Sequence, residues 1–306
     1  FTNSETGWEV PVLKVLLTNL YYLSLEFQRV NQGKENANEC LEDASRIILR
    51  FFTTCLSDKS GIRLSKRKGL LLTMNFLFSI YFKLNNLRLC NNIIRAFQLQ
   101  SEISLLDYPK SEQILFRYLY GKILLNQHNY KEAEVHLEYA YRHCNKSSMK
   151  NKREILIYLL VIKVMHGVKP TDQLLLKYNL SIHFFKLIKA IFEGNVQLFE
   201  EAIAENIQFY IKKEIYLLIQ MQMKDILYRN LFKKIYIVIS KSTNMEYRLP
   251  IKSIVFILRQ LNIPAADLDS IECKIATMIN NGFIRGYISH EKSMVVLSKK
   301  NSFPSI

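Results

Sequence analysis

The amino-acid sequence predicts a mainly α-helical fold, in which a solenoid of helical repeats is followed by a C-terminal winged helix. Apolar residues recur at three- and four-residue spacings along most of the chain, which is the period of an amphipathic helix. Only 9 Gly and 6 Pro occur in 306 residues, fewer turn-forming residues than all-β or α/β chains usually need. Because 49% of the residues are apolar, the chain can also bury a sizeable core.

The clearest repeat spans residues 111–144. Apolar residues at helical spacing fill its first half, Gln127–Asn129 interrupts the pattern, and a second amphipathic helix follows. Gly121 and the small residues Ala133 and Ala140 allow the two helices to approach closely. Two antiparallel helices within about 34 residues match the size of a tetratricopeptide-like (TPR-like) unit.

The same pattern recurs more loosely on both sides of this unit. It predicts helix pairs at residues 65–83 with 87–100, 151–166 with 171–178, and 181–193 with 196–205. Residues 207–223 predict one further helix. Such repeats stack into a solenoid, because each pair buries its apolar face on its neighbours.

The pattern changes near residue 224. The first predicted elements are a helix at 228–240, an extended piece at 247–249 and a helix at 250–261 that begins with Pro250. A turn at 262–264 leads to a helix at 267–280, which Asp267 caps and Asn281–Gly282 ends. Two strands follow at 283–289 and 294–298, on either side of a wing at 290–292. This order is that of a winged helix. We therefore expect helical repeats over residues 1–223 and a winged-helix module over residues 224–306. Because the chain opens with Phe1, we also expect the N-terminal part of the repeats to be truncated.

Basic residues exceed acidic ones, with 42 Lys and Arg against 27 Asp and Glu, a formal charge of +15. Residues 228–306 carry 12 of these basic groups and 5 acidic ones. This excess predicts RNA or DNA binding through phosphates, and the alternative is an ordinary solvated basic face. The candidate nucleic-acid-binding residues are Arg229, Lys233, Lys234, Arg285, Lys292, Lys299 and Lys300.

The helix predicted at 267–280 argues against sequence-specific duplex recognition. A helix that recognises bases in the major groove usually presents Arg, Asn or Gln near its N-terminus. This helix begins with Asp267, Leu268 and Asp269. We therefore expect binding without strong sequence preference.

Two further groups are candidates for protein partners. A second basic cluster consists of Lys146, Lys150, Lys152 and Arg153, of which the last three are the candidate partner-binding residues. This cluster is either a docking site for an acidic disordered partner or an ordinary polar loop. The predicted strands at 283–289 and 294–298 can offer an exposed edge and an apolar patch, with Phe283, Ile284, Tyr287 and Val295 as the candidate residues.

The sequence offers little support for catalysis, a metal site, a cofactor or a membrane span. His136, His143 and Cys144 lack the i, i+4 spacing of a metal-binding helix, and packing is the simpler reading. Phosphate-loop, dinucleotide-loop, nucleophile-elbow and zinc-protease motifs do not occur. The five Cys form no CxxC, which is typical of a reducing compartment. The longest apolar runs, such as residues 155–165, are shorter than a membrane span needs. We predict that the chain is not an enzyme; the alternative is an enzyme that acts on nucleic acid.

Several segments resemble one known family. Lys150–Leu160, Tyr228–Lys234, Gly286–His290 and the tail Val295–Pro304 are similar to the PCI domain-containing protein two family. The resemblance runs from about residue 65 to the end and is densest at 110–166 and 226–304. It implies a PCI domain, in which helical repeats end in a winged helix.

The resemblance also implies a function. Members of that family are subunits of the nuclear-pore-associated complex that couples transcription to mRNA export. In that complex they pair with a GANP/Sac-family scaffold protein and a small acidic protein of the DSS/Sem family. We therefore expect a nuclear, non-catalytic scaffold. The alternative within the same fold is a PCI subunit of a proteasome-lid, signalosome or translation-initiation assembly.

Overall fold

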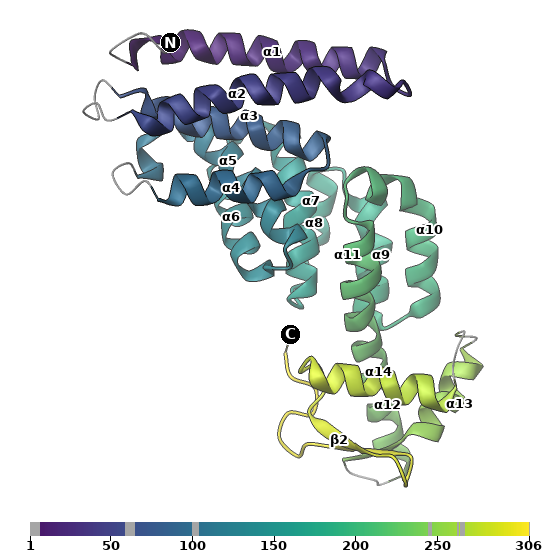
Figure 1. Cartoon of the computed structure of the whole chain (residues 1–306). Helices are drawn as coiled ribbons and strands as arrows, with labels where there is room; N and C mark the ends of the chain where they lie inside the picture. The colour runs from purple at the N-terminus through teal and green to yellow at the C-terminus, as the bar shows by residue number, and fades with distance from the viewer. Residues whose placement is uncertain are drawn as a thin grey trace. The chain divides into compact units, whose positions relative to one another are not determined.

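The computed structural model of the chain describes residues 7–58, 65–99, 104–243, 247–261, 263 and 267–305. These residues are almost entirely helical, with one small sheet near the C-terminus, as Figure 1 shows. They form two compact units, Phe1–Leu156 and Ile157–Ile306, whose boundary falls inside one helix. The predicted fold class, TPR-like helical repeats followed by a winged helix, is confirmed.

The first unit is built of helices that pack on their neighbours in sequence. They are α1 (Val10–Val30), α2 (Glu39–Ser57), α3 (Leu70–Lys83), α4 (Leu87–Gln98), α5 (Lys110–Asn126), α6 (Tyr130–His143) and the first half of α7 (Met149–Met165). Single turns of 3₁₀-helix occur at Gly7–Glu9, Glu35–Asn38, Lys66–Gly69 and Leu105–Asp107. The core lies between the helices, where α2, α3 and α5 contribute side chains such as Ile48, Phe78 and Ile123.

The pair α5 and α6 forms the repeat that the sequence predicts. A Cβ atom at Gly121 would lie 2.7 Å from Cγ of Leu137, so no larger residue fits where the two helices meet. Ala133 and Ala140 are fully buried on the facing side of α6. Small residues on both helices therefore set the spacing of this pair.

The helix Gly7–Val30 is long and apolar enough, by length and composition, to cross a membrane. The sequence expectation considered only the longest apolar runs and missed this helix, in which polar residues such as Thr18 and Ser24 divide the apolar residues into shorter runs. In the structure Leu13 and Leu17 belong to the core of the first unit. The absence of a membrane partner stays a prediction.

The second unit begins with the rest of α7 and continues through α8 (Asp172–Lys177), α9 (Ser181–Glu193) and α10 (Val196–Lys212). The turn between α9 and α10 is made by Gly194, whose φ of +64° favours glycine. A Cβ atom there would lie 2.7 Å from the backbone nitrogen of Leu231, so this turn abuts the backbone of the later helix α12.

The single helix predicted over 207–223 is wrong. Helix α10 continues to Lys212, and the chain then turns through Glu214, a non-glycine residue with a φ of +60°. A new helical run starts with α11 (Tyr216–Leu218), passes through a π-helical turn η5 (Ile219–Met223) and continues as α12 (Lys224–Thr243). The predicted boundary at 223/224 lies inside this run, and the division into repeats over 1–223 and a winged-helix module over 224–306 stays a prediction.

The winged helix consists of α12, β1 (Arg248–Pro250), α13 (Ile251–Gln260), α14 (Leu268–Asn280), β2 (Gly286–Ser289) and β3 (Met294–Leu297). The strands form an antiparallel sheet in the order β1-β3-β2. Asp267 caps α14 as predicted, accepting a hydrogen bond from the Ser270 amide at 3.2 Å. Of the predicted turn at 262–264, Asn262 and Pro264 lie outside the described residues.

Candidate nucleic-acid and partner interface

The start of β2 and the C-terminal tail are joined by two backbone hydrogen bonds. The Arg285 amide donates to the Ser302 carbonyl at 2.9 Å, and the Ser298 amide donates to the Arg285 carbonyl at 2.8 Å. The turn between them holds Lys299 and Lys300, which are exposed, as is Arg285. We call these three residues, Arg285, Lys299 and Lys300, the basic end of the β2–β3 hairpin.

The Arg229 side chain of α12 also binds the C-terminal tail. Its Nη2 donates to the carbonyls of Phe303, at 3.1 Å, and Pro304, and its Nη1 donates to Asn230 Oδ1 at 2.8 Å. Burial lowers the pKa of the guanidinium. The sequence placed Arg229 among the phosphate-binding residues, but in the structure it is buried and bound to the tail. Sequence period alone does not show that a segment 74 residues later folds over it.

The other predicted basic residues lie at different places on the module. Lys233 follows Arg229 by one helical turn, and Tyr236, on the same face, places its ring 5.9 Å from that of Phe303. Lys233 is exposed, and its spacing from Arg229 and Tyr236 places it beside the tail. Lys234 is exposed on the adjoining face of α12. Lys292 lies in the wing, beyond the opposite end of the hairpin, where Ser289 pairs with Met294.

The predicted partner surface on the strands is only partly available. The sequence expected both strands to be exposed, but β3 is the central strand and pairs with β1 and β2. Val295 and Ile284 are core residues with 1% and 3% of their surface exposed, and Phe283 is half-buried. Tyr287 is 63% exposed on the outer face of the sheet, in one row with Arg248 and Val296. The parts of the predicted partner surface that stay accessible are therefore the free edge of β2 and the Tyr287 side chain.

The basic cluster at the start of α7 does not form one solvent-facing patch. Lys150 is exposed, but Lys152 is buried with its ammonium group 4.9 Å from the centre of the Tyr141 ring. Arg153 is half-buried. Lys152 is thus engaged in a cation–π contact, and the exposed charges of the cluster are Lys146 and Lys150.

The wing end of the hairpin adjoins acidic side chains of α14, in addition to Lys292 of the wing itself. A hollow of about 440 Å³ is lined by Asp269, Glu272, Cys273 and Ala276 of α14, Ile288 of β2 and His290 of the wing. His290 Nδ1 and Glu272 Oε1 are 2.8 Å apart, and this hydrogen bond raises the pKa of His290. We call this site the acidic hollow. Sequence reasoning noted the acids on this helix but not the hollow.

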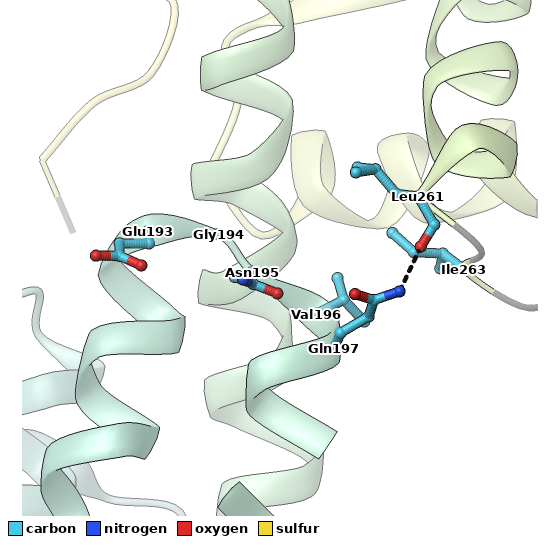
Figure 2. Close-up of a pocket in the computed structure, with 7 residues that line it drawn as sticks. All are labelled: Glu193, Gly194, Asn195, Val196, Gln197, Leu261 and Ile263. Carbon is cyan, nitrogen blue, oxygen red and sulfur yellow. Dashed lines mark hydrogen bonds between the residues drawn. The ribbon is translucent and has the colours of Figure 1, made fainter. Parts of the chain in front are cut away.

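A smaller hollow of about 230 Å³ lies where the α9–α10 turn meets the end of α13. Figure 2 shows Gln197 reaching to Leu261, whose carbonyl accepts a hydrogen bond from Gln197 Nε2 at 3.0 Å. Glu193 is the only titratable residue that lines this hollow in the described part of the chain. The contact ties the repeats of the second unit to its winged helix, and the lining does not resemble a catalytic site.

The histidines that sequence analysis weighed as metal ligands have other contacts. Arg117 Nη1 donates to His136 Nδ1 at 3.3 Å, because a guanidinium has no acceptor atom. Burial, with a contribution from Arg117, lowers the pKa of His136 to about 4. His143 Nδ1 lies 2.9 Å from the Tyr139 carbonyl. Within the described ranges no group of three or more His, Cys, Asp or Glu could hold a metal ion, and the expectation of no metal stays a prediction.

Comparison with known proteins gives a consistent result. A family model for the PCI domain matches residues 169–299. PCI domain-containing protein 2 of Xenopus laevis is 36% identical over 307 residues, which cover 99% of this chain and 75% of that protein. The PCI domain-containing protein 2 homolog of Drosophila melanogaster is 35% identical over 303 residues, covering 99% and 74%. Protein CSN12 homolog of Schizosaccharomyces pombe is 32% identical over 314 residues, covering 98% and 72%.

Proposed function

Because the chain belongs to the family of PCI domain-containing protein 2, we propose that it is a non-catalytic scaffold subunit that binds nucleic acid and protein partners in coupling transcription to mRNA export. Its protein partners are a GANP/Sac-family scaffold protein and a small acidic protein of the DSS/Sem family. Its place of action is the nucleus, at the nuclear pore.

The basic end of the hairpin is the observation that supports nucleic-acid binding. Three cationic side chains, separated by up to 15 positions in sequence, are gathered by the two backbone hydrogen bonds between Arg285 and the tail. Their position is fixed by backbone contacts, while the charged groups remain in water. Such an arrangement suits phosphate oxygens, which are bound without regard to base sequence.

A salt-dependent titration tests this part of the proposal. Fluorescence anisotropy is measured with labelled single-stranded RNA, single-stranded DNA and duplex DNA at several salt concentrations. The variant Arg285→Glu/Lys299→Glu/Lys300→Glu is expected to lose at least tenfold in affinity. Each lost phosphate contact also lowers the salt slope by about 0.7 on single strands and about 0.9 on duplex.

A charge-matched control separates local binding from general attraction. Lys169, Lys189 and Lys212 are exposed lysines of the same compact unit, outside the winged helix. Their reversal to Glu changes the net charge by the same amount and is expected to leave affinity nearly unchanged. Equal losses in the two variants would mean that net charge alone attracts nucleic acid, and would remove the basic end as its site.

The free edge of β2 and the exposed Tyr287 support the scaffold partner. An unpaired strand edge can accept a strand from another chain, and an exposed aromatic side chain is a frequent anchor in interfaces. Co-purification with a GANP-like scaffold fragment and a DSS-like acidic peptide tests for a three-part complex. Tyr287→Asp is expected to weaken binding of the scaffold fragment at least tenfold, and full retention would contradict this assignment.

The acidic partner has a separate test. A ligand that binds only the folded chain raises its melting temperature by mass action. We expect a DSS-like acidic peptide to raise the melting temperature and a scrambled peptide of equal charge to raise it less. An unchanged melting temperature at saturating peptide would count against this partner.

A signalosome-type assembly is the second candidate, and the name of the Schizosaccharomyces pombe relative, Protein CSN12 homolog, favours it. The two functions differ in the partner that binds. Capture by a set of signalosome PCI subunits, with none by the GANP-like fragment, would replace the export proposal with this one.

A further inference from the structure

We propose that the outer face of the small sheet binds single-stranded nucleic acid by stacking a base on Tyr287. This inference rests on the proposed nucleic-acid binding and deepens it. The phosphates that the basic end would bind are present in single strands and duplexes alike, whereas bases are free to stack on a side chain only where they are unpaired. The sheet platform, as we call this site, consists of four outward-facing side chains, Arg248, Arg285, Tyr287 and Val296.

The strand register places these four side chains on one face. Tyr287 and Arg248 pair with Val296 from either side, so the three residues form one row across the sheet. Arg285 precedes Tyr287 by two residues, and its carbonyl accepts a hydrogen bond from the Ser298 amide at 2.8 Å. Arg285 therefore extends the same face along β2. The platform thus has one aromatic ring, with one arginine along the strand from it and another across the sheet.

The platform is open to solvent, whereas the opposite face of the sheet is covered. Tyr287 is 63% exposed, and both arginines are exposed. On β3 the alternation is clear, since Val295 and Leu297 are buried in the core and Val296 between them is half-buried. A ring that a strand positions and leaves exposed on one face is what stacking of a base requires.

The charge of this face favours a polyanion. The remaining outward-facing residues of the strands are Pro250, Ser289, Met294 and Ser298, none of which is acidic. The acidic hollow lies on the other side of the sheet, because Ile288 lines it and alternates with Tyr287 along β2. Arg285 belongs to the basic end as well as to the platform. A strand whose phosphates meet Lys299 and Lys300 can therefore continue onto the platform.

A protein strand at the edge of β2 is compatible with a base on the platform. Such a strand pairs in the plane of the sheet, where its backbone meets that of β2 and its side chains reach Tyr287 from the side. A base stacked on the Tyr287 ring lies outside that plane. The platform can thus hold nucleic acid while the scaffold partner occupies the edge.

Abasic oligonucleotides separate base stacking from attraction to phosphates. The probes are a labelled thymidine oligonucleotide and an abasic oligonucleotide with the same number of phosphates, titrated by anisotropy against the full chain. We expect the thymidine strand to bind at least about fivefold more tightly, as one stacked base provides. This difference should disappear in Tyr287→Leu and persist in Tyr287→Trp, which keeps an aromatic ring.

Salt dependence is a second readout, and loss of a base contact leaves it unchanged. Tyr287→Leu removes no cation, so affinity should fall while the salt slope stays the same. Arg248→Gln should lower the slope by about 0.7 on single strands. The control Phe256→Leu removes a side chain of similar exposure, 64%, from α13 in the same unit and should leave affinity unchanged. Thermal unfolding of each variant checks that the fold is retained.

Photo-crosslinking locates the stacked base directly. A thymidine strand that carries one iodouracil is irradiated with the full chain, and the modified residue is identified by mass spectrometry. We expect the crosslink at Tyr287. Equal affinity of the parent chain for thymidine and abasic strands would overturn the proposal, as would crosslinks confined to residues outside the platform.

The outcomes distinguish this inference from the proposed function. If the basic-end variant loses binding and Tyr287→Leu does not, phosphate binding stands and base stacking is wrong. If the parent chain binds no oligonucleotide, both are wrong. If Tyr287→Leu weakens capture of the scaffold fragment but not of the thymidine strand, Tyr287 is a protein contact alone and the platform is overturned.

Discussion

The two ends of the β2–β3 hairpin differ in charge although they belong to one small module. Arg285, Lys299 and Lys300 gather at one end, whereas Asp269, Glu272 and His290 surround the hollow at the other. Four residues of each strand separate the ends, roughly 13 Å at the usual rise of a strand. A module that is strongly basic by composition therefore contains an acidic site, and net charge predicts the average partner but not the local one.

The ends also differ in what positions their charged groups. At the basic end the backbone and the buried Arg229 hold the tail, and the lysines themselves remain in water. At the acidic end the side chains contact one another, as in the pair of Glu272 and His290. Changes of backbone packing should therefore disturb the basic end more than the acidic one.

Gly286→Ala should have the largest effect, because a Cβ atom there would lie 2.3 Å from the Val296 carbonyl oxygen. We expect the free energy of unfolding to fall by about 2–3 kcal/mol in urea denaturation. Gly282→Ala is the control: its φ of +77° disfavours alanine, but no atom lies close to the new Cβ. Gly282→Ala should lower the free energy of unfolding by about 1 kcal/mol. Equal losses of stability in the two variants would show that the close approach at Gly286 is unimportant.

Arg229→Met tests whether Arg229 stabilises the fold by binding the tail, in contrast to a surface cation that only binds phosphate. It removes the donors to the Phe303 and Pro304 carbonyls and should lower stability by about 2 kcal/mol. It should also weaken nucleic-acid binding, since the tail that carries Lys299 and Lys300 is released. Lys233→Met, one turn along α12, should leave stability within about 0.5 kcal/mol. The opposite ranking in thermal unfolding would reverse the roles given to these residues.

His136 shows what burial, together with a neighbouring cation, does to the pKa of a histidine. Its folded pKa of about 4 lies below the usual 6.5, so the unfolded chain binds the proton first as the pH falls. Stability should therefore be full above pH 6.5 and decline towards pH 4, by about 1–2 kcal/mol after allowance for partial exposure. Urea denaturation at several pH values, compared with His136→Phe, measures this loss. A parallel decline in the variant would assign it to other groups.

His290 should show the smallest and opposite effect. The Glu272 carboxylate raises its pKa, so the pair contributes stability below the unfolded pKa and loses it as the pH rises through the folded one. NMR titration should place the pKa of His290 above the ordinary value and return it towards that value in Glu272→Gln. A pKa that does not change in the variant would show that the pair is absent in solution.

Sequence patterns predicted those elements whose ends carry strong local signals. Helix α9 agrees with its prediction at both ends, because Gly194 terminates it, and α14 follows its cap Asp267. The break at Glu214 was missed because its positive φ occurs without Gly or Asn. In such a case long-range packing determines the turn, and no local residue preference indicates it.

The candidate site was predictable in composition but not in arrangement. The sequence identified Arg285, Lys299 and Lys300 as exposed cations, but not the tail fold that brings them together. It gave Arg229 the same role as Lys233, since both are basic residues on one helix face. The acidic hollow depends on the approach of α14 to β2, which no spacing within either element reveals.

The π-helical turn η5 makes one short stretch tolerant of a change in chain length. Each such turn accommodates one residue more than an α-helical turn does. Removal of one residue from Ile219–Met223 can therefore convert η5 into regular α-helix while α12 keeps its orientation. The same deletion just after Lys224 would rotate the following side chains by about 100° about the helix axis. Single-residue deletions compatible with the winged helix should thus be concentrated in η5, before the helix that carries Arg229 and Lys233.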